Sequence, residues 1–202
     1  MALVRGHPFV EERRVNHVRD MNTAISLEKR EMNTTIYFDR IDTPLGGMLL
    51  AANDVALTGA WFDGERYPPA IDERWQRRRD LPVLRRAAAM LAEYFDGTRK
   101  AFDIPLAPEG TRFQLAVWDQ IFRVPYGETI PYRELAARSG RPEAVRAAGA
   151  ATGRNPLTIF VPCHRIVGAD GSLTGYAGGL DRKRALLALE RDDLVAAARR
   201  AA

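Results

Sequence analysis

A single cysteine, Cys163, lies in a segment whose residue types could make a thiol reactive. An apolar run at residues 159–161 leads to Pro162, and His164 and Arg165 follow the cysteine directly. One cysteine cannot form a disulfide within the chain, and it is a poor start for a metal site, which usually needs several thiolate or imidazole ligands. Cys163 is therefore either a buried bystander or a nucleophile, and the adjacent base and cation favour the nucleophile.

A cysteine nucleophile needs activation, because a free thiol with a pKa of about 8.5 is mostly protonated at neutral pH. His164 is the nearest base, but neighbouring side chains of an extended chain point to opposite sides, so contact requires a turn or a bridging water. Glu190 is the candidate that would orient His164, since it shares the apolar face of a predicted helix with Leu186, and an inward carboxylate is costly unless paired. The alternative is a frayed last turn with Glu190 in water, beside Asp192.

Two further segments flank the cysteine. The Asn155-Pro156 pair could hold the cysteine loop through the side-chain amide or could be an ordinary turn, and these interpretations are compatible. Segment 171–179 is rich in glycine, surrounds one aromatic residue, Tyr176, and lacks the Lys-Ser/Thr ending of a phosphate-binding loop. A flexible wall that closes over a planar ligand fits this segment better than a phosphate site.

The length and composition of the chain indicate its class. A chain of 202 residues with 46% hydrophobic content allows one large domain or two small ones. One cysteine indicates a reducing compartment. No apolar stretch reaches the roughly 18 residues of a membrane span, and the first twenty residues lack the apolar core of a signal peptide. We therefore expect a soluble, cytoplasmic protein.

The net charge of +4 is unevenly distributed. Residues 111–190 hold 11 Lys and Arg against 7 Asp and Glu, whereas residues 32–110 hold 10 against 12. A positive surplus around the cysteine suits a polyanionic partner such as nucleic acid. A solvated, arginine-rich surface explains the same numbers equally well.

The first half of the chain predicts a small antiparallel sheet with one helix. Residues 34–40 alternate between apolar and polar types, as in a half-buried strand. Segments 48–52 and 55–62 flank a turn and predict a hairpin. Residues 84–95 carry apolar side chains at helical spacing up to Gly97, which predicts the end of the helix.

The second half predicts three helices. Thr111 and Gln114 form a capping box at the start of the first helix. Residues 132–139 predict a second helix that Gly140 closes, and Pro142 opens a third helix that continues to about residue 153. The last two helices, with a tight turn between them, fit a helix–turn–helix.

The third predicted helix is made largely of small residues. Small side chains would let its backbone approach another surface closely, including the narrow minor groove of DNA. Arg146 is the long cationic side chain in its middle. The alternative is a close helix–helix contact inside the protein, with Arg146 on the solvent side.

Segment 162–190, which reads PCHRIVGADGSLTGYAGGLDRKRALLALE, resembles the O6-alkylguanine-DNA alkyltransferases, also called methylated-DNA–protein-cysteine methyltransferases. Matching blocks also lie at residues 113–118, 125–129 and 153–156 and at Tyr132 and Arg146. The similarity covers roughly residues 34–190 and is densest after Thr111.

The resemblance implies an α+β fold: a ribonuclease H-like N-terminal sheet with a helix, and a mainly helical, winged-helix-like C-terminal domain. We expect a flexible extension at 1–32, the N-terminal domain at 33–109, the DNA-binding and alkyl-transfer domain at 110–192, and a tail at 193–202.

The resemblance also implies roles for the catalytic residues. Cys163 would accept the alkyl group by direct displacement at carbon. His164 would act as its base through a water, with Glu190 behind it, and Asn155 would hold the turn. Tyr132 would push on the target phosphate and donate a proton to the base.

Further roles concern DNA and the base. Arg146 would fill the gap left by the extruded nucleotide, on a DNA-binding helix that includes Ala147 and Gly149. The guanine pocket would be lined by Tyr176, Ala177, Ile166 and Thr158.

The implied activity is a single-turnover repair reaction that transfers an alkyl group from O6-alkylguanine, and from O4-alkylthymine, in double-stranded DNA to the protein's own cysteine. No cofactor and no metal are expected; one cysteine and three histidines cannot build the structural zinc site of some relatives. We expect a monomer in solution, with cooperative binding on DNA left open. The alternatives are a DNA-binding lesion sensor or regulator without chemistry, and a cysteine hydrolase.

Overall fold

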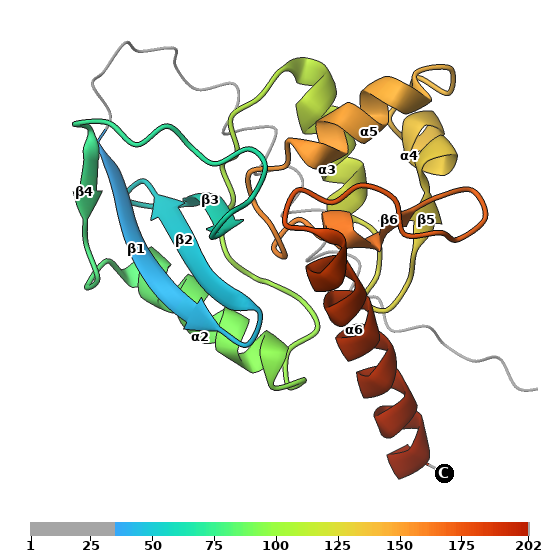
Figure 1. Ribbon diagram of the computed structural model, residues 1–202. Coiled ribbons are helices and arrows are strands. Elements are labelled where there is room, and N and C mark those ends of the chain that lie inside the picture. Colours follow the sequence, from blue (N-terminus) through green and yellow to red (C-terminus); the bar gives the residue numbers. More distant parts are fainter. Residues whose placement is uncertain (1–34, 202) are drawn as a thin grey trace, which may run out of the picture.

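The computed structural model describes the backbone of residues 35–201 and the side chains of residues 35–192 (Figure 1). The predicted extension at 1–32 lies outside these residues. A sheet with one helix forms the N-terminal part, and helices dominate the part after residue 111. This is the predicted α+β fold. No helix among the described residues is both long and apolar enough to cross a membrane.

The sheet has the strand order β3-β2-β1-β4. Strands β1 (Ile36–Thr43), β2 (Gly46–Ala52) and β3 (Leu57–Phe62) pair antiparallel, as predicted. The short strand β4 (Trp75–Arg77) was not expected, and it pairs parallel to β1.

Two details of the sheet differ from the sequence pattern for physical reasons. Strand β3 begins at Leu57 and not at Val55, because the Asn53 side chain accepts hydrogen bonds from two following backbone N–H groups, at 3.0 and 2.8 Å, and turns the chain there. Strand β4 is too short to show a period. It is held by aromatic packing of Trp75 on Phe38, with ring centroids 5.9 Å apart.

Helix α2 (Pro82–Phe95) covers one face of the sheet (Figure 1). Its proline is tolerated in the first turn, where the missing N–H would lack a partner anyway. Leu84, Leu91 and Tyr94 are buried on the side of the core, and Gly97, with φ of 72°, follows the last turn as predicted.

The C-terminal part contains the three predicted helices. Helix α3 (Arg112–Phe122) begins with the capping box, in which Thr111 and Gln114 exchange hydrogen bonds at 3.2 and 2.8 Å. Helix α4 (Tyr132–Arg138) is followed by Gly140 with φ of 78°. Helix α5 (Val145–Gly153) comes next.

The predicted start of the third helix at Pro142 is wrong. The chain first closes a turn in which the N–H of Ala144 donates to the carbonyl of Arg141 at 3.0 Å, and the helix begins only at Val145. The turn between α4 and α5 is therefore longer than predicted.

The cysteine segment joins the two parts. Strand β3 binds it on the free edge of the sheet, where Ala60 donates to the carbonyl of Pro156 at 2.7 Å and accepts from Thr158 at 2.9 Å. A single 3-10 turn, Cys163–Arg165, then leads into β6 (Ile166–Val167).

Strand β6 pairs parallel with β5 (Ile130–Pro131), which immediately precedes α4. This pairing places the start of α4 beside the cysteine turn. The last helix, α6 (Leu180–Ala201), packs against that turn and includes most of the predicted tail.

Candidate active site

The cysteine loop is a tight turn held by Asn155. The amide Nδ2 of Asn155 donates to the carbonyl of Val161 at 2.8 Å and to Sγ of Cys163 at 3.1 Å, while Oδ1 accepts from the N–H of Leu157 at 3.0 Å. Inside this turn Ile159 has φ of 74°, a conformation that a β-branched residue adopts only under constraint. The amide thus fixes the thiol directly, and the compatible turn interpretation also holds.

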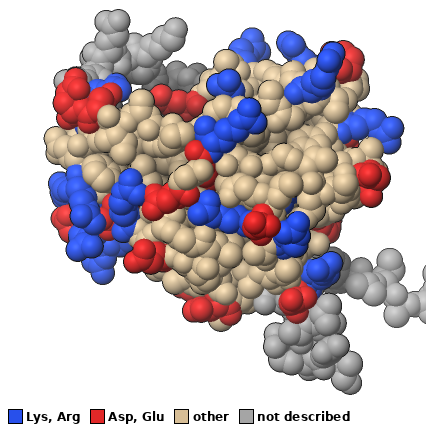
Figure 2. Space-filling view, in the orientation of Figure 1, with Lys and Arg blue, Asp and Glu red and all other residues tan. Residues whose placement is uncertain are grey.

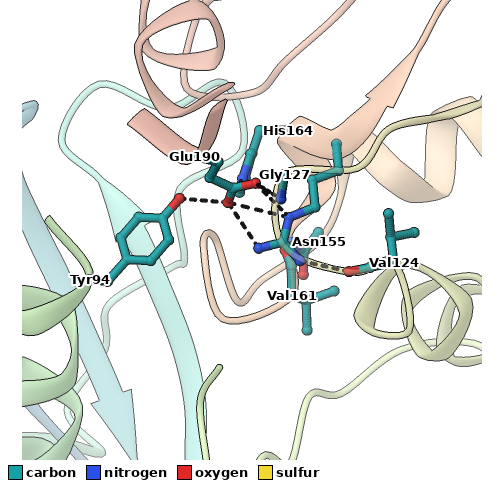
Figure 3. Close-up of polar contacts among 8 residues, drawn as sticks. Tyr94, Val124, Gly127, Asn155, Val161, His164 and Glu190 are labelled. Carbon is teal, nitrogen blue, oxygen red and sulfur yellow. Dashed lines mark hydrogen bonds and ion pairs between the residues drawn. The ribbon is translucent and has the colours of Figure 1, made fainter. Parts of the chain in front are cut away.

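Glu190 is the hub of a buried polar network (Figure 3). Its Oε1 accepts from Nε2 of His164 at 2.8 Å, from the hydroxyl of Tyr94 at 2.8 Å and from Arg165 at 2.8 Å. Its Oε2 accepts from Arg165 and from the N–H of Gly127, both at 3.0 Å. Glu190 and His164 are fully buried, so the alternative of a carboxylate in water is wrong.

The network sets the charges of its members. Burial alone would raise the pKa of Glu190, but the hydrogen bonds and charges of His164 and Arg165 lower it well below its usual range. Burial lowers the pKa of His164, against the opposing effect of Glu190. A neutral imidazole that donates from Nε2 has its lone pair on Nδ1, and this buried atom has no hydrogen-bond partner among the described residues. His164 is therefore oriented as a base.

Cys163 is at rest a protonated thiol. Burial raises its pKa to about 12, against the opposing hydrogen bond from Asn155. Within the described residues Sγ makes no hydrogen bond to His164, although the 3-10 turn replaces the extended chain in which the two side chains would diverge. The predicted need for a turn is met, and a proton path between Cys163 and His164 requires one more group, such as a water.

Tyr132 lies at the first turn of α4, beside α5, the helix of small residues. Its hydroxyl donates to the carbonyls of Thr174 and Gly175, both at 3.3 Å, and burial raises its pKa. A Cβ at Gly149 on α5 would lie 3.7 Å from the Tyr132 ring. The structure thus brings together Tyr132, the helix predicted to bind DNA and the glycine-rich loop.

Two of the predicted pocket residues adjoin the cysteine turn: Ile166 follows it directly, and Thr158 forms a bridge with Val161 just before it. The Tyr176 hydroxyl is buried without a hydrogen-bond partner among the described residues, and Thr158 is 2% exposed. Ile166 is buried, and its carbonyl accepts from Nζ of Lys183 at 2.5 Å. The carbonyl of Ala177 accepts from the N–H of Arg66 at 3.0 Å, so part of this wall is supported from the N-terminal domain.

Helix α5 makes the close internal contact that its small residues allow, and its approach to DNA stays a prediction. Ala148 and Ala151 are buried, and the Ala151 carbonyl accepts from the Trp118 indole at 2.8 Å, which is the predicted close contact inside the protein. Arg146 and Ala147 lie on the opposite, exposed side. One face of the helix is therefore packed and the other is available to a partner.

Five exposed arginines around α3, α4 and α5 lack acidic partners in the described part of the chain, whereas Arg123 and Arg138 pair with carboxylates on their own helices. Within the described residues no ion pair is made by Arg112, Arg133, Arg141, Arg146 and Arg154. In the N-terminal domain, by contrast, most exposed arginines pair with carboxylates, and Figure 2 shows basic and acidic side chains intermingled over the left side of the molecule, where β1 and β4 lie in Figure 1. Exposed guanidinium groups without a carboxylate partner, on the side of the helix–turn–helix, suit phosphate contacts.

Sequence reasoning missed three members of the site. Arg165 is 6% exposed and also donates to the Val124 carbonyl at 2.6 Å; its position next to His164 was the available signal. Tyr94 comes from α2, 96 residues before Glu190, and gave no signal. Lys183 has its ammonium group between two carbonyls, and burial lowers its pKa to about 8.

Comparison with known proteins gives consistent matches over most of the chain. Residues 112–192 match the family model of the 6-O-methylguanine DNA methyltransferase DNA-binding domain, and residues 36–108 match that of its ribonuclease-like domain. A protein of Methanosarcina barkeri named methylated-DNA–protein-cysteine methyltransferase is 45% identical to this chain, over 79% of this chain and 99% of that protein. A protein of Haemophilus influenzae with the same name is 42% identical, over 78% of this chain and 88% of that protein. The crystal structure of Mycobacterium tuberculosis OGT in complex with DNA superposes with a TM-score of 0.73 at 41% identity, covering 78% of this chain and 94% of that one.

Proposed function

This chain belongs to the 6-O-methylguanine DNA methyltransferase family, and we propose that it repairs alkylated DNA by transferring the alkyl group from O6 of guanine to Cys163. The observation that carries the proposal is a single buried thiol that Asn155 binds and that His164, oriented by Glu190, follows directly in the chain. A non-catalytic sensor would need neither the thiol nor an oriented base. A cysteine hydrolase usually takes its histidine from distant sequence, whereas His164 is adjacent to Cys163.

The transfer is a displacement at carbon. The bond between Sγ of Cys163 and the alkyl carbon forms while the bond between that carbon and O6 of guanine breaks. The thiol proton leaves towards Nδ1 of His164, and the departing guanine takes up one proton, for which the Tyr132 hydroxyl is the proposed donor. The product thioether offers no leaving group to water, so each molecule acts once and needs no cofactor.

Glu190 supports this proton transfer through charge. An imidazolium at His164 would be buried, and its cost is offset by the carboxylate 2.8 Å from Nε2. Arg165 holds Glu190 ionised and fixed in place through hydrogen bonds from Nε and Nη2. His164 can therefore accept the proton without leaving its position.

The base must leave the duplex before it can reach Cys163, which costs a few kcal/mol. We propose that the exposed face of α5, with Ala147 and Gly149, approaches the minor groove and that Arg146 occupies the vacated stack. Tyr132 would press on the phosphate of the target nucleotide. The flipped base would lie against Tyr176, whose buried hydroxyl has no other partner among the described residues, with Ala177, Ile166 and Thr158 completing the pocket.

The proposal extends to O4-alkylthymine as a second substrate and to a monomer in the cytoplasm that acts on double-stranded DNA. It also places the domain boundary near residues 109–110. Native mass spectrometry of the free protein tests the assembly state.

The central experiment uses duplex DNA that carries one O6-methylguanine. Intact-mass measurement should show a gain of one methyl group, and peptide mapping should locate it on Cys163. Cys163→Ala should gain nothing while still binding the duplex. Binding without a mass gain in the unaltered protein would instead support the sensor, and repeated turnover of an ester or amide would support the hydrolase.

A further inference from the structure

Glu65, on the N-terminal domain, is a buried carboxyl group that the proposed chemistry does not use. It is 5% exposed and follows β3, the strand that binds the cysteine segment. Buried carboxylates are normally paired with a cation, but Glu65 makes no ion pair among the described residues. Such a group needs an explanation.

The hydrogen bonds of Glu65 point it at the pocket. Its Oε1 accepts from the hydroxyl of Thr158 at 2.9 Å and from the N–H of Phe62 at 3.1 Å. The next residue, Arg66, donates its N–H to the carbonyl of Ala177 at 3.0 Å. Two consecutive residues of the N-terminal domain therefore hold two of the proposed pocket walls. Oε2 of Glu65 accepts no hydrogen bond within the described residues.

The negative charge of Glu65 acts on the Cys163 thiol. Burial is the main cause of the raised pKa of both Cys163 and Tyr176, and the negative charge of Glu65 adds to both shifts. Burial raises the pKa of Glu65 itself, against the hydrogen bonds and the charge of Arg182, the cation that faces it from α6. Glu65 is therefore near enough to Cys163 and Tyr176 for its charge to act on both. Under the proposed function the alkyl group is delivered to Cys163.

We propose that Glu65 is a specificity-determining wall of the alkyl-group pocket, which admits neutral or cationic alkyl groups and disfavours anionic ones. The inference rests on the proposed function, since it assumes that the alkyl carbon is delivered to Cys163. A carboxylate on the alkyl group would be desolvated beside a second carboxylate, and like charges in a site of low dielectric repel strongly. Thr158 alone would not discriminate between charged and neutral alkyl groups, because its hydroxyl is already hydrogen-bonded to Glu65.

The test compares two alkyl groups of the same shape. O6-carboxymethylguanine is anionic, O6-carbamoylmethylguanine is neutral, and O6-methylguanine reports the basic activity; each is placed in the same duplex. Single-turnover rates of Cys163 alkylation are measured by intact mass in mildly alkaline buffer, where a carboxyl group with a raised pKa is ionised. Glu65→Gln keeps an oxygen that accepts from Thr158 and Phe62 but removes the charge. Asp63→Asn removes the same charge two residues away, from an exposed carboxylate paired with Arg40.

The protein should transfer the carbamoylmethyl group faster than the carboxymethyl group. In Glu65→Gln this preference should fall about tenfold, while Asp63→Asn should leave it unchanged. Carboxymethyl transfer that appears only in Glu65→Gln would support the proposal equally. An unchanged preference in Glu65→Gln, or exclusion of both two-carbon groups by the protein and the variant alike, would overturn it, because shape and not charge would then control entry. Loss of methyl transfer in the unaltered protein would refute the proposed function instead.

Discussion

Replacing Glu190 by Gln is the sharpest perturbation of the site, because this carboxylate accepts from four different residues. The amide keeps one acceptor oxygen but turns an NH2 group towards Arg165 or His164. Both of these residues donate hydrogen bonds to the Glu190 carboxylate and cannot accept one from the NH2 group in that arrangement. Arg165 is then a buried cation, 6% exposed, without a counter-ion. Breaking one partner of a buried ion pair costs about 3–5 kcal/mol. For a chain of this size that loss lowers Tm by about 10 °C, at about 2–4 °C per kcal/mol.

Urea unfolding, followed by far-UV circular dichroism, measures this loss, and calorimetry gives the Tm. Asp192→Asn is the matched control, since it removes an exposed carboxylate from the same helix and should change stability by less than about 0.5 kcal/mol. Tyr94→Phe removes one hydrogen bond to the same carboxylate and should cost about 1.5–3 kcal/mol. If Glu190→Gln unfolds within about 1 kcal/mol of the unaltered protein, Glu190 does not form the network described here.

Two further predictions concern DNA and pH. Arg146→Ala should slow methyl transfer from duplex DNA about tenfold or more, yet leave the slow reaction with free O6-methylguanine base within about twofold, because the free base needs no flipping. Arg85→Ala, which removes an exposed arginine on α2 that makes no ion pair among the described residues, is the control. Equal loss on both substrates would contradict the stacking role. The free energy of unfolding should fall as the pH drops below about 6.5, because unfolded His164 then takes up a proton that the folded state resists, and should fall further below about 4.3, because Glu190 has a lowered folded pKa and is protonated first in the unfolded chain. Urea midpoints measured from pH 7.5 to about 3 check this trend, and a flat profile would contradict both assignments.

Local signals in the sequence predicted the parts of the site that local structure determines. The capping box at Thr111 and the helix end at Gly140 depend on neighbours within a few residues, and both are present. Glu190 was predicted to face inward from its spacing on one helix, and the contact with His164 follows from that orientation. A resemblance to a family then supplied roles that spacing alone left open.

Two of the residues that sequence reasoning missed, Tyr94 and Glu65, come from the other half of the chain. They bond to Glu190 and to Thr158, across 96 and 93 residues of the chain. Their own neighbourhoods look like an ordinary helix and a turn, so no local pattern marks them. Strand β4 was missed for a related reason, since aromatic packing of Trp75 and not a periodic pattern holds it in the sheet.

The resting charges of the site suit a protein that can act only once. A thiol with a pKa of about 12 is almost entirely protonated at neutral pH, which protects it from oxidation and from casual electrophiles. His164 is neutral and Glu190 ionised, so the base is ready before substrate arrives. Under the proposed function, entry of the base excludes water and places the alkyl carbon beside Sγ, so that proton transfer and displacement occur together. Asn155→Ala tests how far the resting state of the thiol depends on its hydrogen bond. The substitution should raise the pKa of Cys163 further, because it removes the 3.1 Å hydrogen bond from the Asn155 amide to Sγ.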